Sequence, residues 1–244
     1  MIRILVDSLA DAALTNAQMV NAREIVSRLD PARFQVTMFV VSDPDPRVAN
    51  RLATRLIKLP GRGQTPMILA EFLRGRYDLI FYLKPSPAAK WFLRSRRLTG
   101  KPCPVVGTVE SQCDFRAEPT VSSESVRLWE QTVLRCDHLF ANSRTVQRSL
   151  QTEYGVASEI VPTGVDTGFY APDLGRRRNQ RPRVLFVGSL RPFKGPQIVL
   201  DAAARFPGAD FVLVGDGVMA QELRDRVSRD GLQNVRFRGA LPTS

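Results

Sequence analysis

The sequence is poor in the side chains that most often build metal sites and covalent cross-links. Its 244 residues include three cysteines, Cys103, Cys113 and Cys136, and one histidine, His138. The cysteines are odd in number and lack metal-type spacing, which predicts reduced packing thiols rather than disulfides, ligands or nucleophiles. His138 opens an apolar run, and we expect it to be structural rather than catalytic.

Long apolar runs are also absent. No run approaches the ~18 residues of a membrane span, and residues 1–7 read as a strand rather than as a signal peptide. We therefore expect a cytoplasmic chain. With 43% hydrophobic residues, the length suffices for one large or two modest domains with buried cores.

Acidic residues are outnumbered, since 35 Lys and Arg face 24 Asp and Glu and the formal net charge is +11. Such a balance attracts nucleic acid, anionic lipid or phosphorylated substrates. A GC-rich genome would equally explain the preference for arginine over lysine. No zinc-finger spacing, helix-turn-helix pattern or RNA-binding aromatic motif accompanies the charge, so we expect no nucleic-acid partner.

The densest basic cluster, residues 90–98, mixes cations with aromatic side chains in a helix-like pattern. In one interpretation Trp91 and Phe92 lie at a membrane surface and the arginines face anionic lipid. In the other, which the pattern favours, the aromatic side chains pack on a sheet and the arginines face water.

Apolar runs alternate with helical patterns along the chain, which predicts a doubly wound α/β fold. Expected strands are Ile2–Val6, Phe34–Val41, Leu79–Leu83, Val105–Val109, Leu139–Ala141 and Glu159–Val161, with helices over Ala17–Leu29, Met67–Leu73 and Val126–Leu134. Residues 173–183 are almost free of apolar side chains, which predicts a linker between a first domain, 1–172, and a second, 184–244. Three strand patterns follow the linker, about half of a full doubly wound domain.

The stretch 183–217 is the most informative part of the sequence. The strand-like run Val184–Val187 breaks into the loop Gly188–Gly195, and the run Phe211–Val214 breaks into Gly215-Asp216-Gly217. A helical pattern separates the two runs, as in a βαβ unit with parallel strands. Ligands of such sheets bind at the carboxyl ends of the strands.

The loop Gly188–Gly195 has the features of an anion-binding site. It has glycine at both ends, carries the cations Arg191 and Lys194, and runs into a helix that begins near Pro196. Glycine lets a ligand approach the backbone, and each charge-assisted hydrogen bond contributes about 1.5–3 kcal/mol. We expect a phosphate or diphosphate, although the loop lacks the Walker and dinucleotide-binding patterns.

This loop resembles the donor loop of family-four glycosyltransferases of the GT-B fold, which binds the diphosphate of a nucleotide sugar. Further matches at that family's spacing are Ala141-Asn142-Ser143, Val161-Pro162-Thr163-Gly164-Val165-Asp166, Gly215-Asp216-Gly217 and Val235-Arg236-Phe237-Arg238-Gly239. The resemblance is strongest over residues 137–239.

The resemblance implies two Rossmann-like domains, the second incomplete, with the acceptor on the first and the donor on the second. It implies a retaining hexosyltransferase that moves a sugar from a UDP- or GDP-linked donor to a hydroxyl acceptor, without a metal or cofactor. The expected donor-binding residues are Gly188, Ser189, Arg191, Lys194, Gly195, Gly215, Gly217 and Arg238. We expect a glycan or lipid-linked acceptor in cell-envelope or polysaccharide biosynthesis, with an anionic membrane surface at the inner face as a further partner.

The sequence departs from that family in three places. The loop after the first strand, residues 7–13, lacks the adjacent glycines and carries Asp7 and Asp11, which would repel a diphosphate unless turned away. Ser189 stands where the family most often has arginine. Glu110 stands where the family often has histidine, and it reads either as a catalytic carboxylate that binds sugar hydroxyls or stabilises an oxocarbenium charge, or as a solvated loop residue.

The sequence stops at Ser244, before the acidic loop in which the family carries paired glutamates for the donor. We expect a fragment or a degenerate copy that is a poor catalyst by itself. The alternative is a non-catalytic module that binds nucleotide sugar or phosphate, which predicts binding without turnover.

Overall fold

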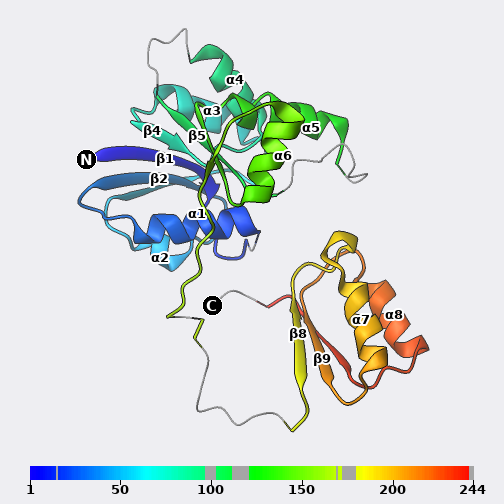
Figure 1. Ribbon diagram of the computed structural model, residues 1–244. Coiled ribbons are helices and arrows are strands. Elements are labelled where there is room, and N and C mark those ends of the chain that lie inside the picture. The colour runs from blue at the N-terminus through cyan, green and yellow to red at the C-terminus, as the bar shows by residue number, and fades with distance from the viewer. Residues whose placement is uncertain (15, 97–102, 112–120, 169, 172–179, 242–244) are drawn as a thin grey trace. The chain divides into compact units, whose positions relative to one another are not determined.

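The computed structural model describes residues 1–14, 16–96, 103–111, 121–168, 170–171 and 180–241. The chain divides into two compact units, Met1–Val165 and Asp166–Ser244 (Figure 1). The predicted linker 173–183 lies mostly outside the described residues, as does Cys113, which we expect to be a reduced packing thiol.

The first unit is built on a parallel sheet. Its described strands are β1 (Ile2–Leu9), β2 (Phe34–Val40), β3 (Thr54–Lys58), β4 (Leu79–Phe81), β5 (Val105–Val109), β6 (His138–Ala141) and β7 (Glu159–Ile160). They pair in the order β3-β2-β1-β4-β5-β6-β7. The order reverses between β1 and β4, which is the switch point where α/β sheets bind ligands beyond the carboxyl ends of the strands.

Helices cover both faces of this sheet (Figure 1). They are α1 (Ala17–Arg28), α2 (Pro46–Ala49), α3 (Thr65–Arg74), α4 (Pro87–Ser95), α5 (Ser123–Glu130), the 3-10 turn η1 (Val133–Arg135) and α6 (Arg144–Tyr154). On one face Leu5 packs in a cluster with Phe72 of α3 and Phe92 of α4. On the other face Ile4 and Val6 pack with side chains of α1 and α2. Neighbouring residues of β1 therefore belong to two different core layers.

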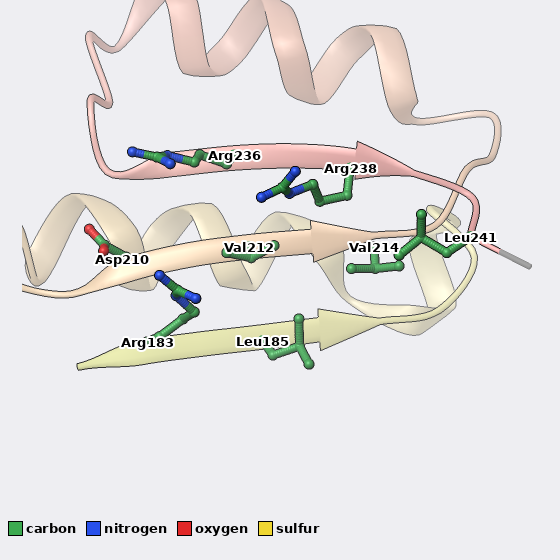
Figure 2. Close-up of a pocket in the computed structure, with 8 residues that line it drawn as sticks. All are labelled: Arg183, Leu185, Asp210, Val212, Val214, Arg236, Arg238 and Leu241. Atoms are coloured by element: carbon green, nitrogen blue, oxygen red, sulfur yellow. The ribbon is translucent and has the colours of Figure 1, made fainter. Parts of the chain in front are cut away.

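The described residues of the second unit form one core layer. Its described strands β8 (Arg183–Val187), β9 (Asp210–Val214) and β10 (Val235–Gly239) pair in parallel in the order β10-β9-β8. The helices α7 (Pro196–Arg205) and α8 (Ala220–Arg229) bury Leu200 and Leu223 against Leu213 of the sheet. On the opposite face Leu185 is 61% exposed, and Figure 2 shows it beside Val212. We call this opposite face the open face of the second sheet.

The fold predicted from the sequence, α/β with two Rossmann-like domains of which the second is smaller, is confirmed. The six strands expected before residue 172 are all present within a few residues. Strand β3 and helix α2 were not predicted, and the helix expected over Val126–Leu134 is α5 followed by η1. The strand expected to reach Leu83 ends at Phe81 because Tyr82 takes a left-handed backbone conformation with φ of 62°.

Residues 90–95 of the basic cluster lie in α4 and Arg96 is its C-cap, whereas residues 97 and 98 lie outside the described residues. Phe92 is buried in the core, and Arg96 pairs with Asp137 at 2.6 Å. Phe92 therefore does not lie at a lipid surface, and Arg96 is already paired with a carboxylate. The membrane interpretation is wrong for these two residues. Trp91, by contrast, is 57% exposed. No helix of the described residues is long and apolar enough to cross a bilayer.

Candidate functional site

The carboxyl ends of the second sheet carry the loops that the sequence marks as a donor site. The loop after β8 is tied to the loop after β9, because the amide of Leu190 donates to the Asp216 carbonyl at 2.9 Å and its carbonyl accepts from Met219 at 3.0 Å. The amide of Gly215 donates to the Gly239 carbonyl at 2.8 Å, which ties in the end of β10. Three strand ends thus form one surface.

Gly215 and Gly217 are required by the contact between these loops. A Cβ atom on Gly215 would lie 1.9 Å from the Gly188 carbonyl oxygen, and one on Gly217 would lie 2.6 Å from the Leu190 carbonyl oxygen. Gly215 also has φ of 140°, which L side chains rarely adopt. Packing alone therefore explains both glycines.

Gly188 is different. A Cβ atom there would meet only the Phe186 ring, at 3.8 Å, so internal packing does not require glycine. Its missing side chain leaves the backbone open at the start of the loop, where a ligand can approach closely. Packing leaves this glycine free for a role in ligand binding.

The two cations of the loop are free to bind an anion. Arg191 and Lys194 are exposed, and within the described part of the chain neither forms an ion pair. The Lys194 ammonium lies 5.4 Å from the centroid of the Phe193 ring. Gly195, with φ of 69°, turns the chain from the 3-10 turn η2 (Pro192–Lys194) into α7. The structure thus brings Gly188, Ser189, Arg191, Lys194, Gly195, Gly215 and Gly217 to one edge of the sheet.

Arg238 lies on the open face (Figure 2). A hollow of about 580 Å³ there is lined by Arg183, Leu185, Asp210, Val212, Val214, Arg236, Arg238 and Leu241. The register places Arg236 on one side of Val212 and Leu185 on the other, so the basic side chains of β10 border an aliphatic strip formed by β9 and β8. Arg238 is therefore part of a different surface from the cations of the loop.

In the first unit Glu110 follows the carboxyl end of β5 and is held by three other elements. Its Oε1 accepts from the Asn21 amide of α1 at 3.0 Å and from the Tyr82 hydroxyl at the end of β4. Its main-chain carbonyl accepts from the Asn142 amide at 3.0 Å, just after β6. Its second oxygen, Oε2, is buried and has no hydrogen-bond partner among the described residues. Glu110 is a fixed carboxylate rather than a solvated loop residue.

The environment of Glu110 acts on Tyr82. Burial first, and then the hydrogen bond to the Glu110 carboxylate, hold the pKa of Tyr82 well above its usual range. The phenol therefore stays protonated at any physiological pH and donates a hydrogen bond to the Glu110 carboxylate.

The two carboxylates of residues 7–13 are turned toward protein donors, and Asp7 lies within β1, which continues to Leu9, rather than in the loop after it. Asp7 accepts from the Lys84 amide at 2.9 Å, and burial raises the pKa of Asp7 to about 6. Asp11 accepts from the amide of Val41 at 3.0 Å and from the hydroxyl of Ser42 at 2.7 Å. Burial acts to raise the pKa of Asp11, but these hydrogen bonds outweigh it and lower the pKa. Residues 7–13, the segment that lacks glycine, therefore direct both of their acidic side chains into the protein.

Sequence reasoning missed Tyr82 and Asn21. Asn142 falls in the motif Ala141-Asn142-Ser143, which the sequence offers only as a match to the family, and Ser143 of the same motif caps α6. Asn21 is 89 residues from Glu110, and no local pattern links them. Tyr82 is the one residue with a polar side-chain group in the run Leu79–Leu83, at the switch point of the sheet, and this was the available signal.

Comparisons with known proteins agree with this geometry. The sequence profile of Glycosyltransferase Family 4 matches residues 20–169. The O-antigen chain mannosyltransferase C of Escherichia coli is 30% identical over 186 residues, covering 69% of this chain and 46% of that protein. A D-inositol 3-phosphate glycosyltransferase of Streptosporangium roseum is 33% identical over 158 residues, covering 56% and 34%. The chain thus spans about half the length, or less, of the curated relatives it matches.

Solved structures share the fold. Anabaena Alr3699/HepE in complex with UDP and glucose superposes with a TM-score of 0.71 at 20% identity, covering 99% of this chain and 70% of that one. WaaG, a glycosyltransferase involved in lipopolysaccharide biosynthesis, gives a TM-score of 0.65 at 14% identity, covering 98% and 70%. This likeness supports a GT-B-like fold of two Rossmann-like domains.

Proposed function

The chain belongs to Glycosyltransferase Family 4, and from that premise we propose that it transfers a hexose from a nucleoside diphosphate to a hydroxyl acceptor. The observation that carries the proposal is the loop Gly188–Gly195, which presents Arg191 and Lys194 without ion-pair partners in the described chain. The proposed donor is UDP- or GDP-linked, since a structural neighbour holds UDP-glucose.

The loop is suited to the leaving group of such a transfer. As the bond between the sugar and the diphosphate breaks, negative charge grows on the diphosphate oxygens. Arg191 and Lys194 would neutralise that charge, at about 1.5–3 kcal/mol for each charge-assisted hydrogen bond before desolvation costs. Gly188 would let the phosphates approach the backbone closely, since nothing but the Phe186 ring lies within reach of a Cβ there.

In the first unit Glu110 is the proposed catalytic carboxylate. Its free oxygen, Oε2, would accept a hydrogen bond from a sugar hydroxyl or stabilise positive charge at the anomeric carbon. Retention of anomeric configuration is part of the proposal and follows from the family resemblance alone.

The proposed acceptor is a glycan or lipid-linked intermediate of the cell envelope. The curated relatives support this, because one is named for the O-antigen chain and another for inositol 3-phosphate. We also propose that the chain meets an anionic membrane surface through α4, where the partly exposed cations Lys90 and Arg94 flank Trp91 on one side of the helix.

The test is calorimetric titration of the chain with UDP and with GDP, paired with an assay of UDP release from UDP-glucose. We expect binding of one nucleotide that weakens about 10- to 150-fold in Lys194→Ala and in Arg191→Ala. Arg205→Ala, at the far end of α7, is the matched control and should bind as the parent does. Binding without UDP release would favour the non-catalytic module, and unchanged affinity in both loop variants would remove the phosphate assignment.

A further inference from the structure

Tyr82 has a backbone conformation that a bulky aromatic residue rarely adopts. Its φ is 62°, in the left-handed region, and it immediately follows the last residue of β4. Among the described residues, Ala53 is the one other non-glycine residue with positive φ. Strain of this kind persists only where the surroundings hold it, and it gathers at functional sites.

The surroundings of Tyr82 fix both ends of its side chain. The ring is 4% exposed and packs with Ile4 and Val6 of β1 and Met38 of β2. It also meets the Phe81 ring edge-on, with centroids 4.9 Å apart. The hydroxyl, at the other end, donates to Oε1 of Glu110. A rigid core contact is thus connected to one oxygen of a carboxylate.

The contacts of Glu110 are unevenly divided between its two oxygens. Oε1 receives two donors, the Tyr82 hydroxyl and the Asn21 amide, and Oε2 receives none from the described residues. The Asn142 amide fixes the main chain of the same residue. A carboxylate held in this way cannot rotate about its terminal bond without losing both donors, so one defined oxygen is left for a ligand.

We propose that Tyr82 is a positioning residue, which together with Asn21 locks the Glu110 carboxylate so that Oε2 is the oxygen presented to the substrate. This inference rests on the proposed function, because it takes Glu110 to contact the substrate. The left-handed backbone of Tyr82 is the device that directs its hydroxyl from the end of β4 to the end of the neighbouring strand β5.

The chain offers a matched control in Tyr77. Its hydroxyl donates to Oε1 of Glu71, and burial followed by that hydrogen bond raises the pKa of Tyr77 to about 12. Glu71 lies on α3 and pairs with Arg55 at 2.9 Å. The pair has the chemistry of Tyr82 and Glu110 but lies within the structural framework, so removal of its hydroxyl tests structural damage alone.

The experiment compares Tyr82→Phe, Tyr77→Phe, Glu110→Gln and the double variant Tyr82→Phe with Glu110→Gln, in UDP release from UDP-glucose. For Tyr82→Phe we expect kcat about tenfold lower, an unchanged KM for the donor and a melting temperature close to that of the parent. Tyr77→Phe should keep the parental kcat. In the Glu110→Gln background Tyr82→Phe should cause no further loss, since Tyr82 acts through Glu110.

Equal losses in Tyr82→Phe and Tyr77→Phe, or additive losses in the double variant, would overturn the inference. If the parent binds UDP and releases none from UDP-glucose, the proposed catalysis fails, and the lock is tested by NMR on the hydroxyl proton of Tyr82, which donates to the Glu110 carboxylate. In the parent this proton should resonate far downfield, as protons in charge-assisted hydrogen bonds do, and Glu110→Gln should move it upfield. An unchanged resonance would overturn the lock independently of activity.

Discussion

Strands β1 and β8 are the first strands of the two units, and they differ in how deeply they are buried. Both are parallel strands of mainly aliphatic residues. In β1 the five consecutive residues Ile4–Ser8 are buried, whereas no residue of β8 is buried and Val187 is 70% exposed. The difference lies in what covers each sheet, because helices pack on both faces of the first and on one face of the second. The identity of a strand and the burial of a strand are therefore separate properties.

The comparison extends to polar groups. The described side chains that are both buried and polar or charged, among them Asp7, Asp11 and Arg23, all lie in the first unit. A two-layer core can enclose an ionisable group, as Arg23 shows: its guanidinium donates to the carbonyls of Asp11 and Leu14 at 2.8 Å each and its Nε lies 3.4 Å from the Asp45 carboxylate. In the second unit Arg226 and Arg229 pair with aspartates, whereas the loop cations Arg191 and Lys194 are exposed and form no ion pair within the described chain.

The largest expected effect comes from one leucine in each strand, the fourth residue of β1 and the third of β8. Leu5→Ala removes a side chain with no exposed surface, and we expect it to destabilise the first unit by about 2–5 kcal/mol. Leu185→Ala removes one that is 61% exposed, and we expect a loss of less than about 1 kcal/mol. Chemical denaturation of both variants measures the difference, and equal losses would contradict the contrast in burial.

The second prediction uses the buried acid of the first unit. Burial raises the pKa of Asp7 to about 6, so the folded state holds the Asp7 proton more tightly than the unfolded chain does. Stability from this proton is complete below about pH 4 and is lost as the pH rises through 6. Asp7→Asn retains an acceptor for the Lys84 amide and should stabilise the first unit by up to about 3 kcal/mol at pH 8.

The gain from Asp7→Asn should vanish at pH 4, and a gain that is the same at both pH values would refute the burial argument. Asp11→Asn is the control, because it should change the stability at neutral pH in the opposite direction. Hydrogen bonds lower the pKa of Asp11 in the fold, so its contribution is present at neutral pH and is lost as the pH falls. That variant should destabilise the unit at pH 8.

The third prediction separates two glycines of the second unit. Gly215→Ala places a Cβ against the Gly188 carbonyl oxygen, and we expect a loss of about 1–3 kcal/mol in stability. Gly188→Ala meets no such contact and should leave the melting temperature within a few degrees of the parental one, while it weakens UDP binding. Thermal unfolding measures the loss of stability and calorimetry the loss of UDP affinity in both variants. A stable Gly215→Ala variant, or a strongly destabilised Gly188→Ala variant, would contradict this assignment.

Much of the fold was predictable from the sequence, for a physical reason. Strands such as β2 and β5 are buried over most of their length and therefore read as largely apolar, β-branched or aromatic runs. Strand β3 lies at the edge of the sheet and reads Thr-Arg-Leu-Ile-Lys, which carries too little apolar character to stand out. Sequence spacing also identified the loop Gly188–Gly195, because its glycines and cations are neighbours in the chain.

The remainder depends on contacts between distant residues. Gly215 and Gly188 resemble each other as loop glycines in the sequence, and the structure distinguishes them: a Cβ on Gly215 would lie 1.9 Å from the Gly188 carbonyl oxygen, and Gly215 has φ of 140°. Tyr82 and Glu110 are 28 residues apart and belong to adjacent strand ends. The exposure of Trp91 next to the buried Phe92 likewise follows from which side of α4 faces the sheet.

The smallest expected effect concerns α4. If Lys90 and Arg94 contact anionic lipid, their replacement by glutamate should weaken the free energy of binding to phosphatidylserine vesicles by about 1 kcal/mol for each cation removed, as measured by sedimentation. Added salt should weaken the binding of the parent. The same reversal at Arg224 and Arg229, exposed on α8, is the control. If the parent bound neutral vesicles as well as anionic ones, or if the α8 variant lost as much binding as the α4 variant, the proposed membrane contact of α4 would be wrong.

The most direct test of the account is hydrogen exchange of the chain with and without saturating UDP. If the loops at the carboxyl edge of the second sheet hold the diphosphate, amide exchange should slow in residues 188–195 and 215–219, and exchange in β10 around Arg236 and Arg238 should stay unchanged. Protection confined to the open face or to the first unit, in a chain that binds UDP by calorimetry, would contradict the assignment of the donor site.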